Sequence, residues 1–228
     1  MSEYTSEIYI VRLSAWAPGI GSSGEWDEWA LDKRSISFES TGPEISYTNS
    51  MFRRRLSQIN KMTIQVVHDL LPLGEDTKIF FLSFRGELSR QYHINKKLIE
   101  EGELSPAAFS LSLYNAPVAL ATIAFGLKGG YSALYLEKNS FTAGIKAAEA
   151  ALLSGTTEEA ALVYADENVP PEYACLFQEC PPPVAFGLLL SRDSRPSSVS
   201  LSSLQKIGDS PLNFLKQLLL RGEIHVSA

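Results

Sequence analysis

The stretch Lys78-Ile-Phe-Phe-Leu82, followed by Gly86-Glu-Leu-Ser-Arg-Gln-Tyr-His93, decides the fold class of this chain. After its lysine, the first segment is a short apolar run, which is typical of a buried strand. The second segment opens a helix that is expected to run to about Glu101. A buried strand that leads directly into a helix is the repeating unit of a layered α/β protein.

The same alternation continues on both sides of this stretch. Branched and aromatic residues predict strands, and apolar residues at helical spacing predict helices. The expected strands are residues 8–13, 35–38, 132–136, 160–165 and 184–190, and the expected helices include 56–71 and the Ala-rich segment 140–153. Strands that alternate with helices indicate a sheet between helical layers.

The composition is that of a globular protein, with 228 residues of which 45% are hydrophobic and 20% are charged. The net charge of −6 argues against a nucleic-acid partner, because proteins of that class carry a basic surface. Residues 1–11 place an acid before their apolar run, unlike a secretory signal, so we expect a cytoplasmic protein. Residues 105–127 carry no charge and match a membrane span in length, but Ser110, Asn115 and Pro117 favour a buried element of a globular core.

The chain is expected to divide into three parts. Residues 1–192 carry the strand and helix alternation, and residues 193–210 form a Ser-rich linker, in which residues 194–203 could also form an irregular surface strand. Residues 211–228 form a C-terminal amphipathic helix and tail. Its stripe of leucines is expected to pack on this domain or on a partner, because so short a helix is marginal in water by itself. The stripe consists of Leu212, Leu215, Leu218 and Leu219.

A glycine motif, Gly19-Ile-Gly21-Ser-Ser-Gly24, matches the pattern of a dinucleotide-binding turn. The acidic residues that follow, Glu25 and Glu28 among them, would repel a pyrophosphate at the helix N-terminus. Dinucleotide binding through Gly19, Gly21 and Gly24 therefore stays as a minor alternative, and a connection entering an acidic helix is the preferred interpretation.

Candidate metal ligands and bases are few. Cys175 and Cys180 have no histidine beside them, so free thiols are expected and a zinc site is not. His68, His93 and His225 are isolated from one another in the sequence, and we expect neither a metal nor a cofactor. The sequence has no Gly-x-Ser-x-Gly motif, which would expose a nucleophilic serine on a strained turn.

The middle of the chain resembles the small β-ketoacyl synthase-like family, over roughly residues 8–192. The segments that carry the resemblance are Phe80-Phe-Leu-Ser-Phe-Arg-Gly-Glu-Leu88, Leu104-Ser-Pro106, Phe109-Ser-Leu-Ser-Leu-Tyr-Asn-Ala116 and Ile123-Ala-Phe-Gly-Leu-Lys-Gly129. The resemblance implies a thiolase-like half, with a mostly parallel, mixed five-stranded sheet between helical layers. It also implies that the strand at residues 132–136 pairs across a dimer.

The resemblance also locates the position of the ketosynthase nucleophile, a cysteine at a sharp strand-to-helix elbow. Counting twelve residues from Gly126 leads to Lys138, which cannot act as an acyl-carrying thiolate. In ketosynthases the two assisting histidines belong to a second half of the fold, and we expect this chain to be a free-standing first half. No catalytic residue is therefore assigned, and the chain is expected not to be a condensing enzyme.

The function implied by the resemblance is that of an accessory, chain-length-factor-like protein in bacterial fatty-acid, polyketide or aryl-polyene-type biosynthesis. Its expected partners are a second copy or a ketosynthase-type protein, together with an acyl carrier protein. One alternative from another class stays open: an acyl-transfer or acyl-binding enzyme with an unrecognised site, for example Ser140 with a distant histidine.

Overall fold

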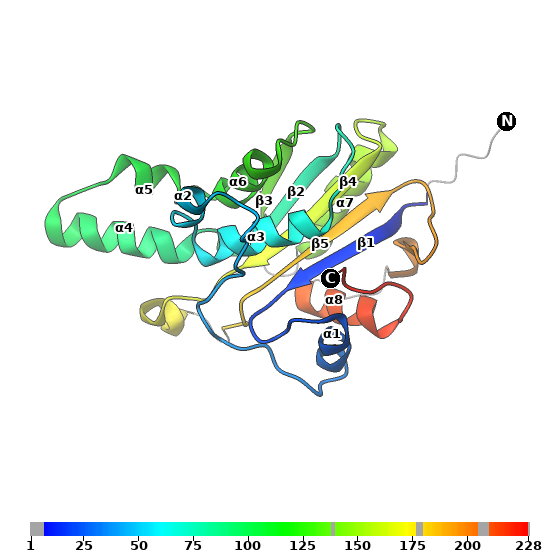
Figure 1. Cartoon of the computed structure of the whole chain (residues 1–228), viewed down its shortest axis with the longest axis horizontal. Coiled ribbons are helices and arrows are strands. Elements are labelled where there is room, and N and C mark those ends of the chain that lie inside the picture. Colours follow the sequence, from blue (N-terminus) through cyan, green and yellow to red (C-terminus); the bar gives the residue numbers. More distant parts are fainter. Residues whose placement is uncertain (1–6, 138–139, 177–179, 205–209, 228) are drawn as a thin grey trace.

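A computed structural model describes residues 7–137, 140–176, 180–204 and 210–227. These residues form a three-layer α/β/α structure around one mixed sheet (Figure 1). The strands are β1 (Tyr9–Trp16), β2 (Lys78–Ser83), β3 (Tyr131–Tyr135), β4 (Glu159–Asp166), β5 (Val184–Ser191) and β6 (Val199–Ser200). The helices are α1 (Ser23–Ala30), α2 (Ser50–Arg53), α3 (Gln58–Asp69), α4 (Leu88–Glu101), α5 (Pro106–Ser110), α6 (Ala116–Phe125), α7 (Phe141–Leu153) and α8 (Pro211–Leu220), with 3-10 turns η1 (Pro171–Leu176) and η2 (Ser202–Leu204).

The strand order across the sheet is β3-β2-β4-β5-β1-β6. β2 pairs in parallel with β3 and with β4, whereas β4–β5, β5–β1 and β1–β6 are antiparallel pairs. The predicted α/β class and layered architecture are confirmed. The strand count differs by one, because β6 lies within the Ser-rich segment, where the sequence pattern is weak.

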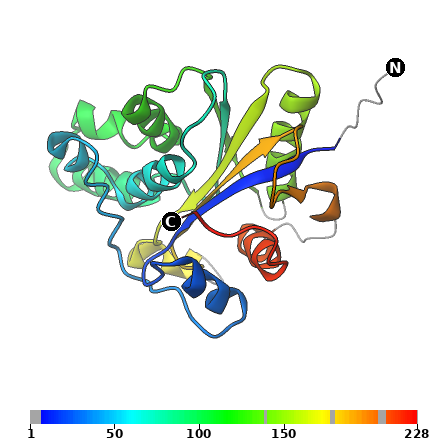
Figure 2. The same ribbon diagram turned by 45° about the vertical axis from the view of Figure 1, so that its right-hand side comes forward.

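Alternate residues of each central strand enter one of two hydrophobic cores. Phe80 and Leu82 face the core that α1, α7 and α8 cover, and Ile79 and Phe81 face the core under α3 and α6. Figure 2 shows these helices on opposite faces of the sheet. β2 is thus buried on both faces, which is why its sequence reads as a continuous apolar run.

One predicted strand is wrong. Residues 35–38 form a loop in which the amide of Ser37 donates to the carbonyl of Pro18. Ile36 is buried, so its side chain belongs to the core although its backbone does not join the sheet. A short β-prone segment needs a neighbouring strand, and this loop lies next to Pro18, beyond the end of β1, where no described strand pairs with it.

The uncharged segment 105–127 folds as two short helices, α5 and α6, separated by a turn. Pro106 and Pro117 each stand in the first turn of their helix, where a missing amide hydrogen costs nothing. Among the described residues, no helix has both the length and the apolar character needed to cross a bilayer.

α8 packs by its apolar face, as the leucine stripe predicts. Phe214, Leu215, Leu218 and Leu219 are buried in the core on the α7 side of the sheet. The ring of Phe214 lies 5.3 Å from that of Phe141, and α8 also packs against α1.

Candidate functional site

The carboxyl ends of β2, β3 and β4 lie together along one side of the sheet, called the carboxyl edge below, because these three strands run in parallel. In open α/β sheets this edge is where binding sites gather. The described segments at this edge are the turn 83–87 at the end of β2, residues 136, 137 and 140 after β3, and Asp166-Glu167-Asn168 at the end of β4. These segments define the candidate site.

Asp166 is fully buried and ties the ends of β2 and β4 together. Its carboxylate accepts hydrogen bonds from the hydroxyls of Ser83 (2.7 Å) and Tyr164 (2.8 Å), and from the amides of Phe84 (3.2 Å) and Arg85 (3.1 Å). The guanidinium of Arg85 lies 3.6 Å away and is itself buried. Burial and the negative charge of Asp166 raise the pKa of Tyr164 well above its usual value. A carboxylate with this many donors acts as a structural crosslink.

The turn after β2 depends on glycine. Gly86 has φ +56°, and a Cβ there would lie 2.7 Å from the ring of Tyr114. The Gly86 amide donates to the Ser83 hydroxyl at 2.7 Å. Tyr114 in turn donates to the carbonyls of Ser83 and Leu134, at 2.6 and 2.8 Å. The turn therefore leads from the carboxyl edge into α4, and Tyr114 holds the end of β2 against β3.

Two further carboxyls, Glu87 and Glu167, are buried beside this turn, with exposed fractions of 0% and 2%. Glu87 accepts from the hydroxyl of Ser57 (2.7 Å) and from Arg90 Nε (3.1 Å). Burial raises the pKa of Glu87. Asn60 lies close enough to favour its charged form, although its amide makes no hydrogen bond of normal geometry.

Glu167 lies between the N-terminal ends of α3 and α4. One of its oxygens accepts from the Ser89 amide at 3.0 Å, and the other from the Ile59 amide at 3.4 Å. Burial, and then the charge of Glu87, raise the pKa of Glu167 to about 7. A carboxyl that titrates near neutral pH is typical of functional sites, although structural acid pairs also produce it.

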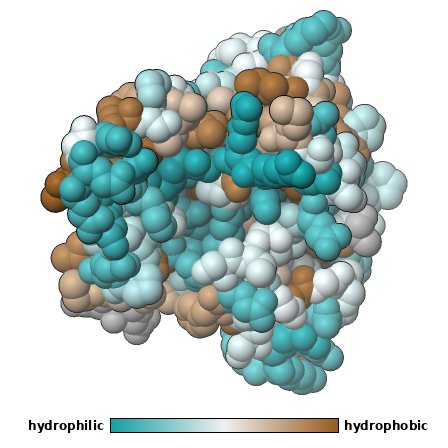
Figure 3. Space-filling view, turned by 60° about the vertical axis from the view of Figure 1, so that its left-hand side comes forward, coloured by the Kyte–Doolittle hydropathy of each residue, from teal (hydrophilic) through white to brown (hydrophobic). Residues whose placement is uncertain are grey.

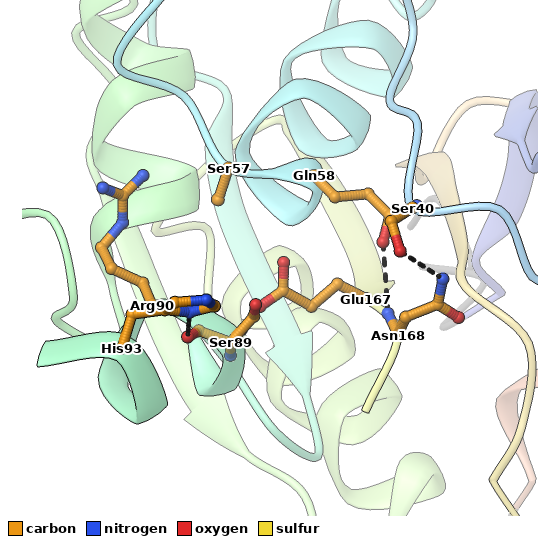
Figure 4. Close-up of a pocket in the computed structure, with 8 residues that line it drawn as sticks. All are labelled: Ser40, Ser57, Gln58, Ser89, Arg90, His93, Glu167 and Asn168. Carbon is orange, nitrogen blue, oxygen red and sulfur yellow. Dashed lines mark hydrogen bonds between the residues drawn. The ribbon is translucent and has the colours of Figure 1, made fainter. Parts of the chain in front are cut away.

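A polar cavity of about 310 Å³ opens next to Glu167 (Figure 4). The carboxyl of Glu167 points toward Ser89, and His93 lies beside it. His93 Nδ1 lies 2.6 Å from the Ser89 carbonyl and must donate to it, so a neutral His93 presents Nε2 as an acceptor. The cavity is lined by Ser40, Ser57, Gln58, Ser89, Arg90, His93, Glu167 and Asn168.

Lys138, the residue at the predicted nucleophile position, lies outside the described residues. The residues on either side show the expected passage from a strand to a helix: Leu136 is buried after β3, and α7 begins at Phe141. The Ser140 hydroxyl donates to the Glu137 carbonyl at 2.7 Å. Gly144 allows α7 to approach β2, because a Cβ there would lie 2.4 Å from Leu82.

The glycine motif leads to a helix start that is occupied by the chain's own side chain. The amides of Gly21 and Ser22 donate to Glu25 Oε2, at 2.7 and 3.1 Å, and these bonds lower the pKa of Glu25. A pyrophosphate at this helix would compete for the same amides. Among the described residues, no cluster of three or more histidine, cysteine or acidic side chains is placed to hold a metal.

The remaining singled-out residues lie apart in the fold. His68 on α3 stacks on Tyr47, with ring centroids 3.9 Å apart, in a second cavity of about 490 Å³. Cys175 is an exposed free thiol and Cys180 a half-buried one. Of the three histidines, His93 lines the cavity at the carboxyl edge. The sequence pattern alone assigns no role to Asp166, Glu167 or Glu87, although the acids at the end of the apolar strand 160–165 were a visible signal.

Comparisons with known proteins agree with this fold. A family profile described as beta-ketoacyl synthase, N-terminal domain, matches residues 26–214. A chain in the structure of the ketosynthase ApeO with its chain length factor ApeC, from Xenorhabdus doucetiae, is 25% identical with a TM-score of 0.73, and the match covers 82% of this chain and 80% of that one. None of the curated proteins compared with the chain matches it.

Two further structures share the fold at lower identity. A chain of the ishigamide ketosynthase/chain length factor has a TM-score of 0.68 at 11% identity, over 83% of this chain and 64% of that one. The ketosynthase from module 1 of the Bacillus amyloliquefaciens FZB42 bacillaene synthase has a TM-score of 0.58 at 16% identity, over 84% and 43%. The chain thus spans less than half of that modular ketosynthase.

The layered sheet and these matches define the class as a thiolase-like α/β protein with the fold of a ketosynthase half. More narrowly, the chain belongs to the β-ketoacyl synthase N-terminal domain family.

Proposed function

We propose that this chain is a non-catalytic, chain-length-factor-like subunit that pairs with a ketosynthase-type protein in the cytoplasm. The pathway we propose is bacterial fatty-acid, polyketide or aryl-polyene-type biosynthesis, with an acyl carrier protein as a further partner. The observation that carries the proposal is the open edge of the sheet at β3, which no other strand among the described residues covers. The complex of ApeO with its chain length factor supports it by analogy.

β3 offers a full row of backbone groups to a second strand. The amide of Ile79 donates to the carbonyl of Gly130, and the amide of Leu136 donates to the carbonyl of Ser83. The even-numbered residues of β3 therefore face β2, and Tyr131, Ala133 and Tyr135 direct their amides and carbonyls away from the sheet. An unprotected edge of this kind is a template for strand addition.

Exposed apolar side chains extend this edge. Tyr135 is 67% exposed, and Leu113, in the turn before α6, is about half exposed. Asn115 donates to the hydroxyl of Tyr131 at 3.0 Å, so the turn before α6 lies against β3. Figure 3 shows hydrophobic patches that interrupt an otherwise hydrophilic surface. Apolar surface next to an open strand favours a protein partner over solvent.

Replacement of Ala133 by Pro is expected to abolish the assembly without unfolding the chain. Proline removes the outward amide hydrogen of β3 and leaves its bonds to β2 in place, and edge strands tolerate proline. The measurement is mass in solution by light scattering, for the chain alone and with a co-expressed ketosynthase. The wild-type chain is expected to be dimeric or partner-bound at micromolar concentration.

Ala133→Val is the matched control, because it adds bulk at the same position and keeps the amide hydrogen. This variant is expected to assemble like the wild type. A wild-type chain that is monomeric at micromolar concentration and retains no ketosynthase would contradict the proposed pairing.

The chain alone is expected to give no condensation product with malonyl and acyl carrier proteins. The reason is that the amine of Lys138 cannot form the thioester that the condensation requires. Product analysis and intact-mass measurement check this, with an active ketosynthase as the positive control. Turnover that a single substitution in this chain abolishes would overturn the non-catalytic assignment.

One observation favours acyl binding as a second candidate function. The cavity of about 490 Å³ beside His68 has largely apolar and aromatic walls, which include Phe52, Leu71, Ile123 and Phe125. Its volume lies within the usual range of small-molecule sites. Intact-mass and binding measurements with acyl donors separate this function from the first, because acyl binding needs no second subunit.

A further inference from the structure

α4 and α5 form an arm that projects beyond the sheet (Figure 1). The structure describes all of α4, and none of its residues is buried. Its main packing partner is α5, and the exposed apolar residues Leu98 and Ile99 lie near its far end. A helix of this length has little stability of its own in water. The direction of the arm therefore depends on the contacts at its root, where Glu87 precedes α4.

The root is held by the two buried carboxyls. Glu167, after β4, accepts the amide of Ile59 at the start of α3 and the amide of Ser89 at the start of α4. Glu87 accepts a hydrogen bond from the hydroxyl of Ser57, which is the N-cap residue of α3. The two acids thus connect α3, α4 and β4 at a point where the backbone has no regular hydrogen-bond ladder.

The charges around the pair do not balance. From α4, Arg90 contacts Glu87 and donates to the carbonyl of Arg55, and His93 lines the neighbouring cavity. From the β2 turn, Arg85 is paired with Asp166, so this neighbouring ion pair adds no net positive charge. One guanidinium therefore faces two carboxyls whose residues are at most 2% exposed. Two like charges in such a site do not both ionise until the pH approaches the raised pKa of Glu167.

We propose that Glu87 and Glu167 hold one proton between them, and that loss of this proton loosens the root of the arm. Because the segment between α5 and α6 contacts α4 through Gln91 and β3 through Asn115, the assembly then responds to pH. This second step rests on the proposed function, whereas the shared proton and the loosening are properties of the isolated chain.

The direction of the pH effect follows from the raised pKa of Glu167, about 7. The folded root binds a proton that the opened root releases. The stabilisation that this proton gives to the folded root is complete below the usual glutamate pKa, and it is lost as pH rises toward 7. At higher pH the carboxylate remains charged in both states, and the effect levels off.

Two measurements on the full chain, without any partner, test the proposal. The carboxyl carbon resonances of ¹³C-labelled glutamates are expected to include one that titrates near pH 7 and disappears in Glu167→Gln. After correction for the intrinsic rate, the protection of the Ile59 and Ser89 amides from hydrogen exchange is expected to fall on the order of tenfold from pH 6 to pH 8.

Glu103→Gln, at an exposed acid beyond the far end of α4, is the matched control and is expected to keep the full pH dependence. Glu167→Gln is expected to remove it. If Glu167→Gln does not fold, the wild-type titration decides alone. Midpoints below pH 5 for all glutamates, or an unchanged pH dependence in a folded Glu167→Gln, overturn the proposal.

These two measurements, together with the mass in solution at pH 6 and pH 8, distinguish the two proposals. If the chain has no partner but a glutamate titrates near pH 7 and the root loosens, the proposed function fails and this inference stands. If the chain assembles equally at pH 6 and pH 8 and no glutamate titrates near neutrality, the inference fails and the proposed function stands.

Discussion

Replacement of Leu218 by Ala is expected to lower the free energy of unfolding by about 2–5 kcal/mol, the cost of a large-to-small change in a packed core. For a chain of this size, that loss lowers Tm by roughly 5–15 °C. Leu218 has no exposed surface and lies in the core that α7 and α1 share. Chemical denaturation and thermal unfolding measure the effect.

Leu220→Ala provides the control on the same helix, because Leu220 is 46% exposed. Its expected cost is below about 1 kcal/mol, as for surface positions in general. Truncation after Arg195 removes all of α8 and is expected to expose the ring of Phe141 and lower the solubility. Equal stability of the two leucine variants would show that α8 does not dock in solution.

Replacement of Asp166 by Ala is expected to cost about 3–5 kcal/mol, the usual cost of breaking a buried ion pair. The substitution leaves the hydroxyls of Ser83 and Tyr164 without their acceptor and the guanidinium of Arg85 without its counter-charge. Both the free energy of unfolding and the near-ultraviolet dichroism of the buried tyrosine report the change.

Asp193→Ala is the matched control, since Asp193 is an exposed acid after β5. Its effect is expected to lie within about 0.5 kcal/mol. The double variant Asp166→Asn with Arg85→Met is expected to be more stable than Asp166→Ala, because it removes the unpaired charge. Additive effects of Asp166→Ala and Arg85→Met would contradict the crosslink.

The sequence predicted those elements whose hydrophobic pattern matches their burial in the folded protein. β2 and β5 are buried on both faces, so their apolar runs were unambiguous. The loop 35–38 was misjudged, and the Ser-rich stretch that holds β6 was left open between linker and strand, because pairing depends on neighbours that a local window does not contain. The family resemblance supplied what periodicity could not, namely the expected open edge at β3.

The buried acids were beyond sequence reasoning for a physical reason. Glu167 binds amides of Ile59 and Ser89, which are 108 and 78 residues away in the sequence. Its environment exists only after two helix starts converge on the end of β4. The residues after each strand could be chosen as candidates, but their burial and shared charge follow from tertiary packing alone.

The position of β1 in the sheet also bears on how the chain folds. Ser14 and Gly187 are paired in adjacent strands but lie 173 residues apart in the sequence. During synthesis at 5–20 residues per second, β1 therefore waits roughly 10–35 seconds for β5 to appear. Contacts of such long sequence separation slow the rate-limiting step of folding. Until then α3, which packs against β1, can cover Val11, whereas Ile10 and Leu13 on the opposite face wait for the core that α7 and α8 complete.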